Sequence, residues 1–122
     1  MLRIGICGFG TVGQSFLRHA IQYQSEIRSN VSVDFEISII ADRSIETKKY
    51  PQNSKITNNI MDVVSNSELD IIIELIGGID LPYQLIKSAI NNGKHIITAN
   101  KALLAEHGDE LFKLAKKNNI YF

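Results

Sequence analysis

A glycine-rich run directly after a short apolar segment constrains this chain more than any other feature. Residues Leu2–Cys7 have the pattern of a buried strand, and the run GFGTVG follows at Gly8–Gly13. Helix-compatible sequence begins at once, so the order predicts a loop of backbone amides at a helix N-terminus. Amides and helix dipole together attract an anion, which favours binding of a dinucleotide's diphosphate.

Each glycine of this run has its own expected role. Gly8 permits the tight turn out of the strand, and Gly10 lets the backbone approach the diphosphate because glycine has no Cβ atom. Gly13 lets the helix pack close to the sheet. The amides of Phe9–Val12 are then expected to face the anion, and the alternative is a glycine-rich turn without a ligand.

Composition limits the classes of partner. The chain has 122 residues, which predicts one domain with a real core. Lys and Arg number 13, as do Asp and Glu, and this balance argues against a nucleic-acid or anionic-membrane surface. The three histidines do not share the spacing of a metal site, so we expect no metal.

The single cysteine, Cys7, excludes an intramolecular disulfide and fits a reducing compartment. We expect it to be a buried small apolar residue of the first strand. No apolar run is long enough to span a bilayer, and the N-terminus enters a strand without a signal peptide. A cytoplasmic location is therefore expected.

The first half of the chain alternates helix and strand patterns. A helix is predicted from Thr11 to about Arg28, and a strand covered on both faces at Phe35–Ala41. Arg43–Thr57 is expected to be a surface loop with a degraded short strand, followed by a short helix near Asn58–Ser65. The apolar stripe of the first helix is Val12, Phe16, Ala20, Tyr23 and Ile27.

The second half continues the alternation. A strand is predicted at Asp70–Ile76, then a helix capped by Asp80 that ends near Gly93. A further strand at His95–Ala99, a helix from about Ala105 to Asn118 and an opening strand at Ile120–Phe122 complete the chain. The buried stripe of the middle helix is Leu81, Leu85, Ala89 and Ile90.

This alternation predicts an α/β fold with a Rossmann-type, doubly wound, mostly parallel sheet. The second strand is expected beside the first on one side, and the later strands on the other. Ligands of such sheets bind where the strand order reverses, outside the carboxyl ends of the strands. That switch point lies between Leu2–Cys7 and Asp70–Ile76.

Two neighbouring residues bear on the choice between NAD and NADP. Asp42 ends the second strand, where a carboxylate accepts hydrogen bonds from ribose hydroxyls and favours NAD. Arg43 follows it, and a guanidinium there grips a 2′-phosphate and favours NADP. Lys48 and Lys49 are candidate helpers for a phosphate. A solvated pair opening a loop is the alternative for Asp42 and Arg43.

The carboxyl ends of the later strands add further candidates. Glu74 is a carboxylate in an apolar strand, so it must be paired, hydrogen-bonded or exposed, and it can border the cofactor groove. Ile76, Gly77 and Gly78 place backbone at the switch point with room for a cofactor. Lys101 follows the HIITAN strand, where its ammonium can polarise or protonate a carbonyl oxygen near the nicotinamide.

Three segments resemble the cofactor-binding domain of homoserine dehydrogenase. They are RIGICGFGTVG, the ELIGG run at Glu74–Gly78, and KHIITANKALLAEHG at Lys94–Gly108, in the family's order. The resemblance implies an NAD(P)-dependent oxidoreductase that interconverts L-aspartate 4-semialdehyde and L-homoserine, towards threonine and methionine. It also implies that Lys101 is catalytic and lies beside the nicotinamide, and that Arg43 approaches the adenosine end.

The resemblance further implies that the substrate residues and most of the dimer interface belong to a downstream domain. We therefore expect residues 1–122 to be a truncated piece that binds dinucleotide without turnover, from a parent homodimer. Two alternatives remain open. One is a standalone dinucleotide-sensing module, in which Lys101 would be dispensable; the other is a different NAD(P) oxidoreductase, such as a relative of aspartate or semialdehyde dehydrogenases.

Overall fold

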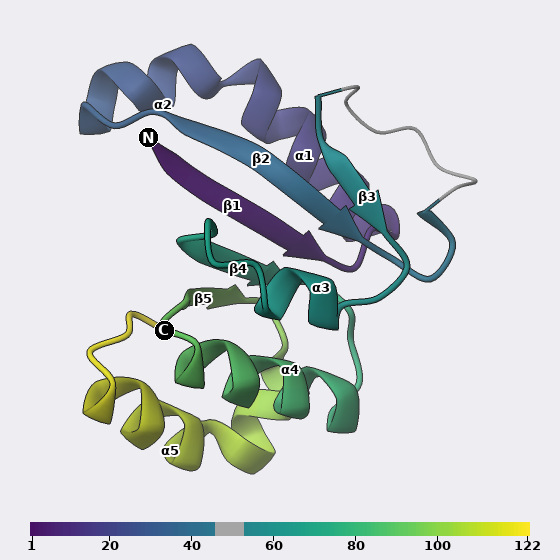
Figure 1. Cartoon of the computed structure of the whole chain (residues 1–122), viewed down its shortest axis with the longest axis vertical. Helices are drawn as coiled ribbons and strands as arrows, with labels where there is room; N and C mark the ends of the chain where they lie inside the picture. Colours follow the sequence, from purple (N-terminus) through teal and green to yellow (C-terminus); the bar gives the residue numbers. More distant parts are fainter. Residues whose placement is uncertain (46–52) are drawn as a thin grey trace.

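A parallel sheet forms the centre of the molecule. In the computed structural model, which describes residues 1–45 and 53–122, five strands lie in the order β3-β2-β1-β4-β5 (Figure 1). All four neighbouring pairs are parallel, as predicted, and the reversal falls between β1 and β4. The strands are β1 Leu2–Cys7, β2 Phe35–Ala41, β3 Lys55–Thr57, β4 Ile71–Glu74 and β5 His95–Thr98.

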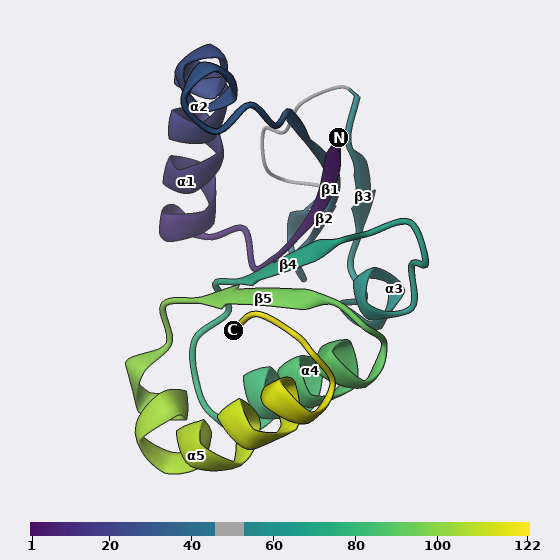
Figure 2. The same cartoon turned by 90° about the vertical axis from the view of Figure 1, so that its left-hand side faces the viewer.

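Helices cover both faces of the sheet. Helices α1 and α2 lie on one side, while α3, α4 and α5 lie on the other (Figure 2). Connections that place helices on both faces of a parallel sheet define the doubly wound architecture. The helices are α1 Thr11–Gln22, α2 Gln24–Val31, α3 Met61–Val64, α4 Asp80–Asn91 and α5 Lys101–Lys117.

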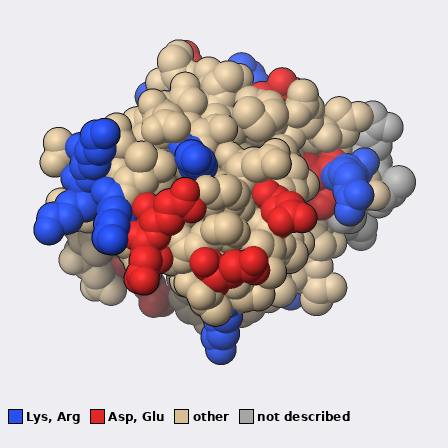
Figure 3. Space-filling view, turned by 90° about the horizontal axis from the view of Figure 1, so that it is seen from below, with Lys and Arg blue, Asp and Glu red and all other residues tan. Residues whose placement is uncertain are grey.

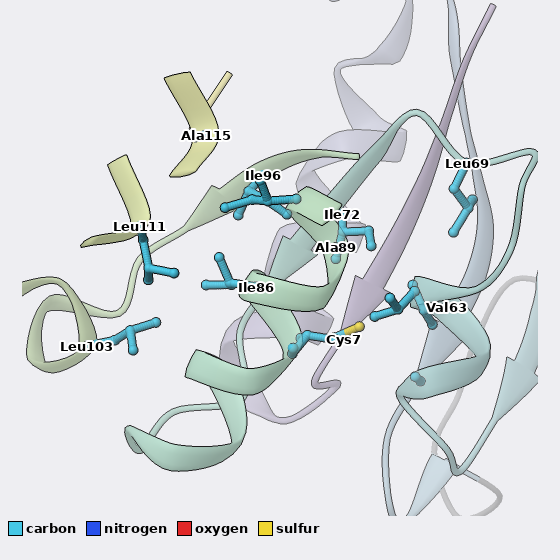
Figure 4. Packing of buried hydrophobic residues seen from close by; sticks show 14 of the residues in the cluster. Cys7, Val63, Leu69, Ile72, Ile86, Ala89, Ile96, Leu103, Leu111 and Ala115 are labelled. Carbon is cyan, nitrogen blue, oxygen red and sulfur yellow. The ribbon is translucent and has the colours of Figure 1, made fainter. Parts of the chain in front are cut away.

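Two apolar clusters fill the layers between sheet and helices. Consecutive strand residues point to opposite faces, so Ile39 and Ala41 join the larger cluster and Ile40 joins the smaller one. Figure 4 shows the larger cluster, in which Ile86 and Ala89 of α4 pack near Ile96 of β5. The residues towards the carboxyl ends of β1, β2 and β4 are buried and mostly apolar, whereas Leu2, Arg3 and Glu36 near the amino ends are exposed.

The predicted first helix is interrupted. It was expected to run from Thr11 to about Arg28, but it ends at Gln22 and a second helix begins at Gln24. No glycine or proline marks the break at Tyr23. The predicted stripe is buried only in part, since Ala20 is buried while Val12 is 60% exposed.

Helix α4 forms where predicted but starts one residue earlier, at Asp80, and two details of the prediction are wrong. The Asp80 side chain makes no capping hydrogen bond, because Asp80 is the first helical residue and Ile79 holds the cap position. Leu81 is 46% exposed, and Ile86, which was not in the predicted stripe, is buried. The buried face of α4 is therefore formed by Pro82, Leu85, Ile86, Ala89 and Ile90.

The C-terminal region differs from the prediction at both ends. Helix α5 starts at Lys101 rather than near Ala105, because Asn100 caps it by accepting a hydrogen bond from the Leu103 amide. No strand forms at Ile120–Phe122. The backbone there makes one sheet-like bond, from the Ile96 amide to the Tyr121 carbonyl at 2.9 Å.

Charged side chains of both signs share the surface. On the end of the molecule seen from below, acidic and basic side chains lie interspersed rather than in one large patch (Figure 3). Within the part of the chain that the structure describes, no helix is both long and apolar enough to cross a membrane.

Candidate dinucleotide-binding site

The loop from β1 to α1 has the close contacts that demand glycine. Gly8 has a φ of +98°, a left-handed conformation that side chains rarely adopt. A Cβ atom there would lie 2.7 Å from the carbonyl carbon and oxygen of Leu75, just beyond β4. The turn after β1 therefore packs directly against the backbone that follows β4, at the switch point.

Gly13 and Gly10 differ in what surrounds them. A Cβ atom on Gly13 would lie 2.4 Å from the Gly8 carbonyl oxygen, so this glycine lets α1 pack against its own loop rather than against the sheet. A Cβ atom on Gly10 would meet no described atom within 4 Å. The space in front of Gly10 is open, as a cradle for a diphosphate requires.

The amides of Gly10, Thr11, Val12 and Gly13 have no acceptor among the described residues. The helical ladder begins only at Gln14, whose amide donates to the Gly10 carbonyl at 2.9 Å. Amides without an acceptor at a helix N-terminus attract anions, and the residues present fit a dinucleotide's diphosphate.

Phe9 does not present its amide as expected. The Phe9 amide donates to Asp42 Oδ1 at 2.9 Å, and the Phe9 side chain is buried. The carboxylate at the end of β2 therefore holds the loop in shape. This bond uses one donor that the sequence interpretation had assigned to the anion.

A pocket of about 170 Å³ lies between this loop and the end of β2. Gly8, Gly10, Asp42, Arg43 and Ile76 are among the residues that line it. Asp42 Oδ2 also accepts from the Ser44 amide at 3.0 Å, and the exposed Arg43 side chain lies beside it. Lys48 and Lys49 lie outside the described residues.

A second pocket of about 310 Å³ lies on the other side of the loop. Its lining includes Val12, Glu74, Gly77, Asn100 and Lys101, which come from the exits of β1, β4 and β5. The structure thus brings Lys101 to the same edge of the sheet as the glycine loop. Ile76 lines the first pocket and Gly77 the second, so the β4 exit separates the two.

Lys101 is exposed and is the first residue of α5. A cation at a helix N-terminus gains nothing from the helix dipole, whose positive end lies there. The placement of Lys101 therefore does not serve the stability of α5. An ammonium beside an open pocket is instead suited to interact with a ligand oxygen.

The remaining chemistry-bearing side chains do not form a second centre. Burial, reinforced by the Glu74 carboxylate, raises the pKa of the Cys7 thiol to about 12, so Cys7 is a neutral core residue. His19, His95 and His107 lie on α1, β5 and α5 respectively. The described residues contain no cluster of three or more His, Cys, Asp or Glu that could hold a metal ion.

Sequence reasoning missed Thr98 and Asn100. Thr98 Oγ1 donates to Glu74 Oε1 at 2.6 Å, and Asn100 Nδ2 donates to the Gly78 carbonyl at 2.6 Å. The one available signal was Glu74, a charge in an apolar strand, and its partners come from a strand that lies 24 residues away.

Comparison with known proteins relates the chain to one family. A family model described as the NAD-binding domain of homoserine dehydrogenase matches residues 8–122. The homoserine dehydrogenase of Pseudomonas aeruginosa is 40% identical over 119 residues, which cover 98% of this chain and 27% of that protein. The chain thus spans about a quarter of that relative's length.

Solved structures show the same likeness. A homoserine dehydrogenase from Thiobacillus denitrificans superposes with a TM-score of 0.91 at 34% identity, covering 98% of this chain and 28% of that one. The Staphylococcus aureus enzyme gives a TM-score of 0.88 at 34% identity, with 98% and 31% covered. The chain belongs to the homoserine dehydrogenase family and spans the NAD(P)-binding, Rossmann-type part of it.

Proposed function

We propose that residues 1–122 form the cofactor-binding portion of an NAD(P)-dependent homoserine dehydrogenase. The carrying observation is that four unengaged amides, Gly10–Gly13, and the Lys101 ammonium flank one switch point. The amides provide the anion site and the two pockets divide the cofactor between them. The reaction would interconvert L-homoserine and L-aspartate 4-semialdehyde, a step towards threonine and methionine.

The two pockets suit different halves of a dinucleotide. The pocket beside Asp42 and Arg43 takes the adenosine half, because β2 ends there and its last residues read the ribose. The pocket beside Gly77 and Lys101 then takes the nicotinamide half. Gly8 and Phe9 shape the loop between them, and Ile76 lines its adenosine side.

Lys101 is the proposed catalytic residue. When bound, the cofactor supplies hydride transfer. Beside it, the Lys101 ammonium would stabilise negative charge on the substrate's carbonyl oxygen, or protonate that oxygen. Such a role requires an exposed cation held by a rigid element, and the capped start of α5 provides one.

The choice between NAD and NADP rests on Arg43. The Asp42 carboxylate accepts hydrogen bonds from the Phe9 and Ser44 amides, and these bonds orient it towards the glycine loop. The exposed Arg43 guanidinium remains as the group suited to a 2′-phosphate. We therefore propose that Arg43 supports NADP binding, while Asp42 acts mainly through the loop.

The matched relatives extend well beyond the segment that aligns with this chain. The Pseudomonas aeruginosa relative is nearly four times as long as the match, and we propose that its additional length supplies the substrate pocket and the dimer interface. Turnover requires the substrate at near-attack distance, so the 122-residue chain would bind cofactor without turnover. A homodimeric parent in the cytoplasm fits the family and the single cysteine.

Calorimetric titration of the chain with NAD and NADP tests the binding claim. Arg43→Ala should weaken NADP about tenfold or more and leave NAD nearly unchanged, because charge-assisted bonds to a phosphate are lost. Arg18→Ala, on the exposed side of α1, is the matched control. Equal losses of affinity for NAD and NADP would reject the 2′-phosphate role of Arg43. Failure of the unsubstituted chain to bind either cofactor would reject the site.

The catalytic claim needs the full-length protein. Lys101→Ala should lower kcat far more than cofactor affinity, because its contribution is made in the transition state. Lys113→Ala, exposed on the same helix, is the control. Unchanged turnover with Lys101→Ala would remove Lys101 from catalysis and favour a dinucleotide-sensing role for the domain.

A further inference from the structure

We propose that Glu74 is a positioning residue that holds together the two loops around the Lys101 pocket through a closed ring of hydrogen bonds. This inference rests on the proposed function and adds the means by which the pocket keeps its shape. Glu74 is only 1% exposed, at the end of β4, yet it carries a carboxylate. A buried charge is costly unless donors surround it, so its partners indicate its purpose.

One oxygen of Glu74 fixes the exit of its own strand. Oε2 accepts from the Ile76 amide at 2.8 Å and lies 3.4 Å from the Gly77 amide. These bonds turn the chain away from the sheet two residues after β4 ends. They also explain why β4 stops at Glu74, although the apolar pattern predicted a strand to Ile76.

The other oxygen of Glu74 reaches the neighbouring strand. Oε1 accepts from Thr98 Oγ1 at 2.6 Å, and Thr98 Oγ1 in turn accepts from the Asn100 amide at 3.1 Å. The hydroxyl therefore transmits the position of Glu74 to the exit of β5. A short bond to a carboxylate is among the stronger hydrogen bonds of a protein.

Asn100 closes the ring and starts α5. Its Nδ2 donates to the Gly78 carbonyl at 2.6 Å, which links the β5 exit back to the β4 exit. Its Oδ1 accepts from the Leu103 amide at 3.1 Å and caps the helix whose first residue is Lys101. The position of Lys101 thus depends on Glu74 through Thr98 and Asn100.

The chemistry of the ring explains the choice of a carboxylate. Backbone N–H groups and a hydroxyl approach both oxygens, so both positions must accept. A glutamine at this position would replace one of the two accepting oxygens by an NH₂ group, which would face an N–H or O–H donor instead of accepting from it. Glu74 and Asn100 of the ring line the second pocket. Thr98 and Asn100 do not line the first pocket beside Arg43, so substitutions at these two positions separate an effect on the second pocket from an effect on the first.

The test compares each dinucleotide with its adenosine half by calorimetry on the 122-residue chain. NADP is paired with adenosine 2′,5′-bisphosphate, and NAD with ADP. Thr98→Val removes the bond to Glu74, with Thr98→Ser as the conservative partner. Asn100→Asp keeps the helix cap but loses the donor to Gly78, so it retains the start of α5.

Thr98→Val and Asn100→Asp should each weaken the dinucleotide about tenfold, while the adenosine half changes less than about twofold. Thr98→Ser should restore dinucleotide affinity to near that of the parent. Equal weakening of both ligands, or no weakening of either, would overturn the ring as a positioning device. A parent chain that binds neither ligand would overturn the proposed function itself.

Discussion

The two most deeply buried charges among the described residues are Glu74 and Lys94. They lie at opposite ends of the parallel strands, here called the carboxyl edge and the amino edge of the sheet, and they have different surroundings. Glu74, at the carboxyl edge, accepts from the Ile76 amide in the loop after β4 and from the Thr98 hydroxyl at the end of β5, and it lines an open pocket. Lys94, at the amino edge, is 5% exposed, and its Nζ donates to the Leu69 carbonyl at 2.9 Å. Burial lowers the pKa of Lys94, and the Asp70 carboxylate opposes that shift in part.

The same contrast extends to the backbone. At the amino edge, the Arg3 amide donates to Asp70 Oδ2 at 2.8 Å and the Tyr121 amide donates to His95 Nδ1 at 3.0 Å. At the carboxyl edge, the amides of Gly10–Gly13 have no acceptor among the described residues. The described amino-edge groups Arg3 and Tyr121 are thus bonded within the protein, whereas the amides of Gly10–Gly13 at the carboxyl edge have no protein acceptor among the described residues.

The largest expected effect comes from the glycine loop. Gly13→Ala should cost about 3 kcal/mol of unfolding free energy, because its Cβ atom would lie 2.4 Å from the Gly8 oxygen. Gly10→Ala should leave stability nearly unchanged and weaken dinucleotide binding about tenfold, since its Cβ atom enters open space. Urea unfolding and calorimetry measure the two. Tight binding by Gly10→Ala would contradict the cradle.

At the amino edge, Lys94→Met should cost about 2 kcal/mol of unfolding free energy, because the Leu69 carbonyl loses its donor. Dinucleotide affinity should stay at the parental value, since Lys94 lies at the opposite edge. Chemical unfolding and calorimetry of the same samples check both statements. A loss of dinucleotide affinity without a loss of stability in Lys94→Met would contradict the claim that the amino edge contributes to stability and not to binding.

Lys101→Gln should raise the unfolding free energy by about 0.5 kcal/mol, because it removes a cation from the positive end of α5. Lys113→Gln, in the middle of the same helix, serves as the comparison and should change stability less. Thermal unfolding at low ionic strength shows the difference best. A clear destabilisation by Lys101→Gln would mean that Lys101 supports the fold.

The smallest effect concerns Asp34, just before β2 at the amino edge. Hydrogen bonds from Gln24 and from the Phe35 amide lower the pKa of Asp34. The stabilisation is therefore present above the ordinary carboxyl pKa of about 4 and is lost as the pH falls below it. The Tm difference between the unsubstituted chain and Asp34→Asn should shrink from about pH 6 to about pH 3. Thermal unfolding measured at several pH values across this range checks it. A constant difference would contradict the sign.

Several features of the carboxyl edge could be predicted from the sequence because they depend on residue type and on patterns within a short stretch of chain. The positive φ of Gly8 and the bounds of β2 at Phe35–Ala41 follow from residue type and hydrophobic pattern. The family resemblance was carried by the same kind of local motif, and the comparisons confirm it.

Most of the missed features depend on contacts between residues that are distant in the sequence. The Phe9 amide bonds Asp42 across 33 residues, and Glu74 bonds Thr98 across 24, so no local pattern announces either pair. The misplaced start of α5 has a local cause instead: Asn100 caps the helix by accepting from the Leu103 amide three residues along the chain, which places the start at Lys101.

The central claim is that the amides of Gly10–Gly13 bind a cofactor's diphosphate. Amide chemical shifts of the ¹⁵N-labelled chain, followed during a titration with NADP, test it most directly. The account predicts large shifts at Gly10, Thr11, Val12 and Gly13, with the amide of Lys94 unmoved. Shifts confined to the amino edge, or no saturable shift in the loop, would contradict it.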